Sequence, residues 1–505
     1  MKSGPAKYAF WCFACVSSIF FYVFAHNSGF GYDTLEYLVL GRSLADGSPF
    51  YSLIPSKSFG IYYVIAALIR AGVPFGHKSL SLLVTGVYAS CITVTWFVLK
   101  DMLGHRVALA TAVLVGLCAV FMEMNYLEPE SFVFLSGLAA YYLLLDNYQK
   151  PTFSTSCLVG ISLGIGFCFK AVAVFYVTGA ITFVALSVLK KELTVSRAVV
   201  LVGGMCTGFV LMIGATCAYY AFTGRAYDYW MWTVRFPLFY YSPTTVWLKV
   251  LYIKLLWFHI LLIFSFIVIA LDFHLRRSIW DNEHVRLALC LAAFSYLSLL
   301  KQQSSHYCFP GAGFFSIFIV CTLGGTPFGT KVSALRTQRL VAGMILVILA
   351  CLLSTAFHKP DSLKRVVEWR TFEEEKSLSS YIHRYCPAGS RALFVNYDAH
   401  FLYWISSTKP AGRFPNLNVQ GTYFVERYPD ALITLASDIG VKIVEFDPAL
   451  PFEMRYRKRD DPALVGDENG RRLLAEFGRE LARNHRLIAD SPSSYHFWVW
   501  HTAPP

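Results

Sequence analysis

The sequence predicts an α-helical polytopic membrane protein with a small soluble α/β domain at its C-terminal end. Of the 505 residues, 56% are hydrophobic and 15% are charged, whereas a soluble domain is usually about one quarter charged. Several apolar runs reach the roughly 20 residues that span a bilayer. After residue 358 the sequence has many charges and few long apolar runs. This change divides the chain into a membrane domain, residues 1–358, and a soluble domain, residues 359–505.

Hydrophobic patterning predicts about eleven membrane-spanning helices. We place them at Tyr8–Ala25, Ser79–Leu99, Val107–Met122, Ser131–Leu145, Cys157–Phe169, Ala171–Leu189, Ala198–Phe222, Val250–Leu271, Val285–Leu300, Tyr307–Leu323 and Leu340–Phe357. The first span follows Lys2 and Lys7 and has no small-x-small cleavage pattern after it. We therefore interpret it as a retained signal anchor.

One apolar segment, Phe59–Val73, is predicted not to span. It is short and contains Arg70, and an apolar run of this length is more often interfacial or re-entrant. If it does not cross and the N-terminus is cytoplasmic, every cytoplasmic loop between the predicted spans is basic, as the positive-inside rule expects. An odd number of crossings then places residues 359–505 on the external, periplasmic side of the cell membrane.

The soluble domain is predicted to be a small α/β sandwich. Helical periodicity occurs at Glu373–Tyr385 and Leu473–Arg483, and β-rich stretches occur at Ala392–Asn396, Val441–Phe446 and His496–His501. The basic run Arg455–Asp461 is typical of a solvated loop, with a lipid-headgroup contact as the alternative. A lone cysteine, Cys386, excludes an intramolecular disulfide framework in this domain. The net charge of +12 does not indicate nucleic-acid binding, because much of it lies in short loops between apolar runs.

The segment Gly31–Lys57 carries the first group of candidate residues. Within it, Thr34–Ala45 has the periodicity of a helix lying in the membrane interface. Asp33 and Glu36 are three residues apart and so share a helical face. A carboxylate at the bilayer edge can accept a proton from a hydroxyl nucleophile. Two simpler interpretations are that Asp33 only caps the helix and that the segment is a solvated connection.

A second group lies in the acidic turn Tyr126–Glu130 between two predicted spans. Pro129 suits the first turn of the following helix. Glu130 is then near a helix N-terminus, where a carboxylate is favourable for the helix dipole without any other role. Glu128, just before the turn, is the better functional candidate of the two.

Cationic residues on the same predicted membrane side form a third group. It comprises Lys57, Lys170, Arg235 and His306, the last followed by Tyr307. Lys170 separates two apolar stretches. The positive-inside rule does not account for a lysine at an external helix junction, so we consider a bound anion there. The alternative is that Lys170 snorkels to the headgroups. The aromatic loop Ala226–Trp247 is either an interfacial aromatic belt or a platform for a sugar or acceptor.

These motifs, in this order, resemble those of the integral-membrane GT-C glycosyltransferases. The resemblance covers roughly Tyr8–Phe357 and is to the branch with protein O-mannosyltransferases, lipid A aminoarabinose transferases and bacterial dolichyl-phosphate-mannose-type mannosyltransferases. It is carried by Asp33, the turn Gly47-Ser48-Pro49-Phe50, Lys57 before Ile61-Tyr62-Tyr63, Glu128 or Glu130, Lys170, and His306-Tyr307 with Pro310.

The resemblance implies a GT-C-like fold with a donor site at the external membrane face. By resemblance, Asp33 is the catalytic base, the second acid is Glu128 or Glu130, and Lys57, Lys170 and His306 lie near the donor phosphate. Of the two acids, we take Glu128 as the catalytic candidate. We expect Glu36, Arg42, Tyr62, Glu130, Arg235 and Tyr307 to complete the substrate-binding site.

The leading hypothesis is transfer of a sugar from a polyprenyl-phosphate donor to a hydroxyl or amine on a glycan, lipid or protein. The alternatives are a transporter or flippase of a lipid-linked or anionic substrate, and a catalytically inactive scaffold. Transporters place charges near the bilayer midplane, often on internal repeats. No repeat is evident here and the charges gather at one face, which favours the enzyme. Whether Asp33 and Glu128 share a divalent cation is left open, because paired carboxylates alone do not establish one.

Overall fold

The computed structural model describes residues 4–27, 31–240, 260–267, 269, 281–297, 305–324, 372–395, 399–414, 424–425, 427–446, 467–488 and 495–500. The chain forms two compact units, each built from separate segments. Unit 1 comprises Met1–Gly29, Phe75–Phe222 and Pro243–Trp369, and unit 2 comprises Phe30–Pro74, Thr223–Ser242 and Arg370–Pro505. Unit 2 thus unites two segments of the predicted membrane domain with the C-terminal part. The predicted domain boundary at residue 358 lies outside the described residues.

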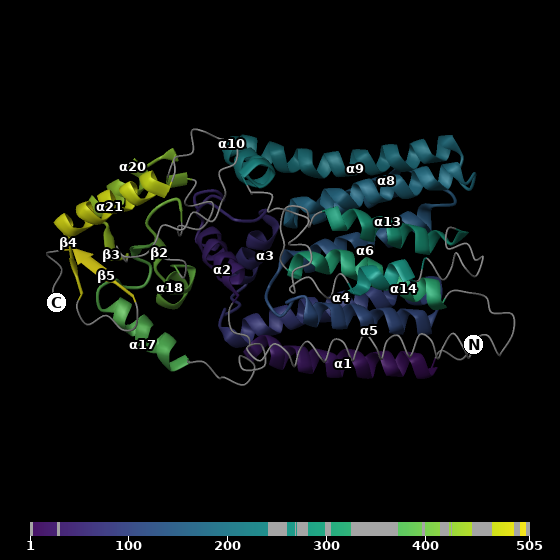
Figure 1. Ribbon diagram of the computed structural model, residues 1–505, viewed down its shortest axis with the longest axis horizontal. Coiled ribbons are helices and arrows are strands. Elements are labelled where there is room, and N and C mark those ends of the chain that lie inside the picture. The colour runs from purple at the N-terminus through teal and green to yellow at the C-terminus, as the bar shows by residue number, and fades with distance from the viewer. Residues whose placement is uncertain are drawn as a thin grey trace. The chain divides into compact units, whose positions relative to one another are not determined.

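Unit 1 is a bundle of helices that pack side by side with their long axes in a common direction (Figure 1). Its described helices are α1 (Gly4–Asn27), α4 (His77–Leu103), α5 (His105–Phe121), α6 (Pro129–Asn147), α7 (Phe153–Phe169), η1 (Ala171–Ala173), α8 (Val174–Leu189), α9 (Val195–Phe222), α13 (Glu283–Tyr296), η6 (Ser305–Cys308) and α14 (Phe309–Gly324). Nine of the predicted spans lie in the described residues, apart from a few residues at an end. Each of these spans coincides with a helix, which confirms the helical membrane fold. Val250–Leu271 is described only at residues 260–267 and 269, and Leu340–Phe357 lies outside the described residues.

Length and composition separate these helices into two classes. Among the described residues, the stretches long and apolar enough to cross a membrane are Ala6–His26, Lys78–Leu103, Ala171–Leu189 and Val195–Phe222. Shorter apolar helices occur at His105–Phe121, Phe153–Phe169 and Phe309–Thr322. The shorter helices pack among the longer ones. Because both classes are apolar, unit 1 is an apolar bundle.

Glycines bring α7 and α9 into backbone contact. A Cβ atom at Gly160 would lie 2.0 Å from the carbonyl oxygen of Met205, and one at Gly208 would lie 2.0 Å from that of Cys157. Gly204 and Gly208 are four residues apart, the spacing by which small residues let membrane helices approach closely. This contact fixes α7, and the residue directly after α7 is Lys170.

Unit 2 contains a mixed sheet with the strand order β2-β1-β3-β5-β4. The strands are β1 (Arg391–Phe394), β2 (Lys409–Pro410), β3 (Val441–Glu445), β4 (His485–Leu487) and β5 (Phe497–Trp500). β1 runs parallel to β2 and β3, whereas β5 runs antiparallel to β3 and β4, with Ile443 opposite Val499. The three predicted strands are confirmed as β1, β3 and β5. β2 and β4 were not predicted, because two or three residues are too few to show an alternating pattern.

The helices of unit 2 come from all three of its chain segments. They are α2 (Tyr32–Ala45), α3 (Gly60–Arg70), α10 (Ala226–Tyr229), η2 (Trp230–Tyr240), α17 (Phe372–His383), α18 (Ala399–Ser406), α20 (Asp430–Ile433), η7 (Thr434–Ser437) and α21 (Asp467–Asn484). α17 and α21 confirm the two helices predicted near these positions. The basic run Arg455–Asp461 lies outside the described residues.

Two segments of unit 2 bear on the membrane prediction. α3 has 11 residues and is therefore about 16 Å long, about half of the roughly 30 Å hydrocarbon core. As predicted, it is too short to cross. The aromatic segment predicted as a loop is instead helical over α10 and η2, and its side chains Tyr229, Met231, Trp232 and Phe236 are buried.

Candidate functional site

The first cluster of candidate residues, in unit 2, is an ion pair between Asp33 and Lys57. The Lys57 ammonium lies 3.0 Å from a carboxylate oxygen of Asp33, and the two side chains are 9% and 23% exposed, respectively. Asp33 lies in the first turn of α2, whose N-cap is Gly31 and has no side-chain capping bond. The alternative that Asp33 merely caps the helix is therefore wrong. Its carboxylate is turned to Lys57 and remains partly accessible.

Glu36 lies one turn further along α2 and holds the segment that carries Lys57. Its side chain is fully buried, and its Oε1 accepts hydrogen bonds from the Ser56 amide at 2.7 Å and the Tyr62 hydroxyl at 2.6 Å. The Tyr62 hydroxyl in turn accepts a bond from the Lys57 amide at 3.2 Å. Glu36 and Tyr62 thus fix the backbone at Ser56 and Lys57, from which the Lys57 side chain extends to Asp33.

Burial sets the protonation of Glu36. Burial first, and then the nearby Asp33 charge, raise the pKa of Glu36, and these effects outweigh the hydrogen bonds from Tyr62 and Ser56, which lower it. The neutral acid is thereby favoured.

α18 adds two residues that pack against α2. Burial lowers the pKa of His400 to about 3, although the charge of Asp33 acts in the opposite direction. The fully buried imidazole is therefore neutral. The Arg42 guanidinium lies 4.4 Å from the centre of the Trp404 ring, and burial lowers the pKa of Arg42. Sequence reasoning missed His400 and Trp404, because nothing in the sequence links the C-terminal domain to α2.

The second cluster, in unit 1, joins Glu130, Lys170 and Tyr307. Glu130 lies in the first turn of α6, and Lys170 is an extended residue between α7 and η1. The Lys170 ammonium forms a hydrogen-bonded ion pair with the Glu130 carboxylate and lies 3.2 Å from the centre of the Tyr307 ring. Lys170 and Glu130 are both buried. The snorkelling interpretation of Lys170 is therefore wrong, since its charge is compensated inside the bundle.

The remaining candidates, Glu128, Arg235 and His306, lie in three different elements. Glu128 is the buried N-cap residue of α6 and makes no side-chain capping bond, and Pro129 occupies the first turn as predicted. Arg235 lies in η2 and is partly buried. His306 belongs to η6, but its side chain lies outside the described part of the structure.

The structure therefore groups the predicted residues by unit. Asp33, Glu36, Lys57 and Tyr62 come together in unit 2, and Glu130, Lys170 and Tyr307 come together in unit 1. Within the described residues, no three His, Cys, Asp or Glu side chains are grouped as a metal site would need. The divalent cation that the sequence left open for Asp33 and Glu128 stays untested.

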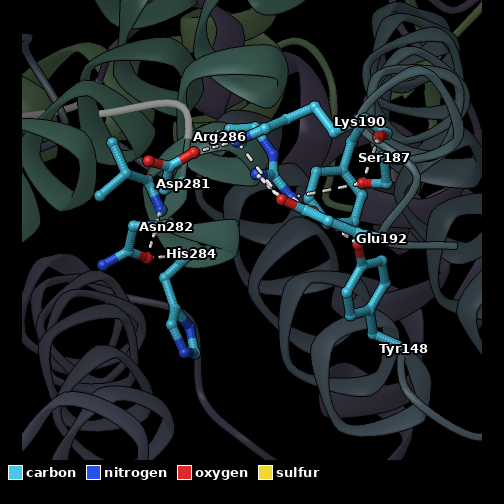
Figure 2. Close-up of polar contacts among 10 residues, drawn as sticks. Tyr148, Ser187, Lys190, Glu192, Asp281, Asn282, His284 and Arg286 are labelled. Atoms are coloured by element: carbon cyan, nitrogen blue, oxygen red, sulfur yellow. Dashed lines mark hydrogen bonds and ion pairs between the residues drawn. The ribbon is translucent and has the colours of Figure 1, made fainter. Parts of the chain in front are cut away.

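A third polar cluster (Figure 2) includes Tyr148, the C-cap residue of α6, and so lies at the end of that helix away from Glu130. The fully buried Arg286 of α13 donates two hydrogen bonds to the Glu192 carboxylate, one of them at 3.0 Å, and contacts the Ser187 hydroxyl at 3.4 Å. Tyr148 also donates to Glu192 at 3.0 Å. An arginine within the predicted span Val285–Leu300 was the available signal, since a charge inside an apolar span needs a partner.

This third cluster ties helix ends together. Lys190 pairs with Asp281 at 2.5 Å and with Glu192 at 3.3 Å, while Asn282 caps α13 by accepting from the amides of His284 and Val285. Burial raises the pKa of Glu192, but its bonds from Arg286 and Tyr148 outweigh burial and lower the net value. Because the charged groups satisfy one another, we interpret the cluster as a clamp joining α6, α8 and α13.

Comparison with known proteins agrees with this fold. Residues 55–217 match the family model for dolichyl-phosphate-mannose-protein mannosyltransferase. ArnT from Cupriavidus metallidurans bound to undecaprenyl phosphate is similar in structure, with a TM-score of 0.56 and 11% identity over 98% of this chain and 99% of that chain. The oligosaccharyltransferase AglB from Archaeoglobus fulgidus, in complex with an inhibitory peptide and a dolichol-phosphate, has a TM-score of 0.51 and 10% identity over 99% of this chain and 75% of that chain. No curated protein sequence matches the chain. The chain therefore shares the fold of ArnT and of the oligosaccharyltransferase AglB, and part of it matches a mannosyltransferase family model.

Proposed function

We propose that this protein transfers a sugar from a polyprenyl-phosphate-linked donor to a hydroxyl or amine acceptor. The observation that carries the proposal is the Asp33–Lys57 ion pair, which places a partly accessible carboxylate 3.0 Å from a cation. The complexes of ArnT and AglB with polyprenyl phosphates support the class of donor. Mannose, aminoarabinose and other sugars are all compatible with this proposal.

In the proposed reaction, Asp33 is the general base. It takes the proton of the acceptor hydroxyl or amine as the acceptor atom bonds to the anomeric carbon of the sugar. The bond between that carbon and the phosphate oxygen breaks, and polyprenyl phosphate leaves with the electron pair. Lys57 compensates the charge that develops on the phosphate. Glu36 and Tyr62 hold the Lys57 segment.

In unit 1, we propose that the buried Lys170 offers a further cation to a phosphate oxygen. Glu130 and the Tyr307 ring hold its ammonium in place, and cation–π contact with a tyrosine strengthens when the site is desolvated. Glu128 is the alternative base, and we propose Arg42, Arg235 and His306 as additional ligands of the substrates.

We propose that the protein lies in the inner or plasma membrane with a cytoplasmic N-terminus and unit 2 on the external side. The basic loops predicted on the cytoplasmic side support this orientation. A cysteine introduced at the exposed Ser437 is then labelled by a membrane-impermeant maleimide in intact cells. The parent protein gives the background from its own cysteines. Labelling of Ser437→Cys that requires permeabilised cells contradicts the orientation.

The test of the function is release of polyprenyl phosphate by purified protein. Polyprenyl-phosphate sugars of several kinds are incubated with candidate acceptors, and omission of the acceptor measures simple hydrolysis. Acceptor-dependent release of polyprenyl phosphate from at least one donor is the expected result. Movement of a lipid-linked sugar across reconstituted vesicles without release would instead establish a transporter.

A further inference from the structure

The segment between α2 and α3 contains a residue in an unfavourable backbone conformation. Tyr51 has a φ angle of 65°, in the left-handed region that a bulky residue rarely adopts. Its side chain is buried, and its hydroxyl shares a hydrogen bond of 2.9 Å with the hydroxyl of Thr233. Such a conformation persists only where surrounding contacts enforce it.

Arg413 supplies those contacts from the C-terminal part of unit 2. Its Nη2 donates to the Tyr51 carbonyl at 3.2 Å and to the Asp228 carboxylate at 2.8 Å. Its own carbonyl accepts a hydrogen bond from the Ile54 amide at 2.7 Å. One residue therefore holds the segment at two points and ties it to α10, which contains Asp228.

The segment held by Arg413 continues directly to Lys57. Beyond Ile54, the next fixed points are the amides of Ser56 and Lys57, which bond to Glu36 and to Tyr62. The chain is thus held on both sides of a short stretch, and the Lys57 ammonium meets Asp33 at the end of it.

We infer that Arg413 is a positioning residue for the proposed transfer reaction, acting through the segment Tyr51–Lys57 on the Asp33–Lys57 pair. This inference rests on the proposed function. A guanidinium suits the task because its planar fork reaches a carbonyl and a carboxylate from one fixed side chain, which an ammonium on a flexible stem does less well. The C-terminal part then has a role in the proposed reaction besides any contact with an acceptor.

The test is a double-mutant cycle on kcat/KM for the release of polyprenyl phosphate. Arg413→Met should lower kcat/KM about ten- to hundred-fold, the scale expected for misplacing a reacting group. If Arg413 acts through Lys57, the same substitution in a Lys57→Ala background should have little further effect, since coupled residues are non-additive. Arg413→Lys should recover part of the rate. An equal loss in both backgrounds, or no loss in either, overturns the inference.

Lys409→Met is the matched control. Lys409 also joins the C-terminal part to the α2–α3 region, through an ion pair of 3.2 Å with Asp46 in which both side chains are well exposed. Exposed pairs contribute little, so this variant should retain the wild-type rate.

A structural measurement separates this inference from the proposed function. A cysteine at Ser52 reports how firmly the segment is held, and its maleimide labelling should be faster with Arg413→Met and unchanged with Lys409→Met. An inactive wild-type protein refutes the proposed function whatever the labelling shows. Unchanged labelling at Ser52 with Arg413→Met refutes the positioning role even in an active enzyme.

Discussion

Asp33 and Lys57 come from opposite ends of the segment Gly31–Lys57, yet their charged groups lie 3.0 Å apart within unit 2. The Lys57 side chain is almost buried, whereas Asp33 is 23% exposed. A molecule arriving from solvent therefore meets the carboxylate of this pair more readily than the ammonium. This is the order that a general base with a fixed neighbouring cation needs.

Asp33→Asn should lower turnover per folded molecule about a hundred-fold or more, the usual scale for losing a positioned base. Asparagine keeps the size of the side chain but removes the charge that faces the nearly buried Lys57 ammonium, so a loss of stability accompanies the loss of turnover, and rates are expressed per folded molecule. Thermal stability and initial rates are measured in the same detergent. If the variant turns over normally per folded molecule, Asp33 is not the base, and Glu128 becomes the candidate.

Glu36→Gln should have a small effect on stability at low pH, because glutamine reproduces the acceptor that the neutral carboxyl offers to Ser56 and Tyr62. The folded state raises the pKa of Glu36 above its ordinary value of 4.5. Between pH 4.5 and the folded pKa, the folded protein binds more protons than the unfolded chain. The contribution of Glu36 to the free energy of unfolding is therefore full below pH 4.5 and is lost as pH rises through the folded pKa.

The measurement is the free energy of unfolding across pH for the wild type and the variant. The difference between the two should change in favour of Glu36→Gln as pH rises above 4.5. Glu36→Ala is the comparison, because it leaves the Ser56 amide without its acceptor at every pH. The prediction is wrong if the wild type instead becomes more stable than Glu36→Gln as pH rises, because that result would show that Glu36 is ionised in the folded protein.

Lys170→Met should destabilise the protein by about 3–5 kcal/mol, since it leaves the buried Glu130 carboxylate without its cation. Adding Glu130→Gln removes that stranded charge and should restore most of the stability. Enzyme activity should stay low in the double variant if Lys170 binds phosphate. Thermal unfolding and donor turnover are compared for the single and double variants. A double variant that is stable and fully active would reduce the pair to a structural role.

The Arg286–Glu192 clamp predicts an asymmetry between its two ends. Arg286 is fully buried and the Glu192 side chain is 29% exposed. Glu192→Gln strands a buried guanidinium and should cost about 3–5 kcal/mol. Arg286→Met should cost less, because Glu192 can still reach water and Lys190. Unfolding of both variants is measured, and equal or reversed costs contradict the proposed clamp. Turnover per folded molecule should not change.

The membrane helices were predictable because a bilayer demands long apolar runs and basic cytoplasmic loops. Which side chains pair with one another could not be predicted from the sequence. The sequence favoured Glu128 over Glu130, but Lys170 contacts Glu130, and this choice depends on how α6 and α7 pack. That packing rests on glycines such as Gly160, whose spacing alone does not name a partner helix.

The parts of the candidate site that came from the C-terminal domain were beyond sequence reasoning. His400, Trp404 and Arg413 lie in a stretch with no recognised motif, and their contacts with the α2–α3 region join residues far apart in the chain. Such contacts depend on tertiary packing, whereas the Asp33–Glu36 spacing depends only on helical geometry.

The discontinuity of unit 2 has a consequence for biosynthesis. Its first segment ends at Pro74 and its last begins at Arg370, so the helices of the first segment are made long before the sheet that completes their unit. At roughly 5–20 residues per second, translation takes on the order of 15–60 s to reach that last segment. During this time the Lys57 segment lacks Arg413. A nascent chain arrested before Arg370 should therefore carry its membrane helices but no finished reaction centre, and a chaperone would find α2 and α3 exposed in the interval.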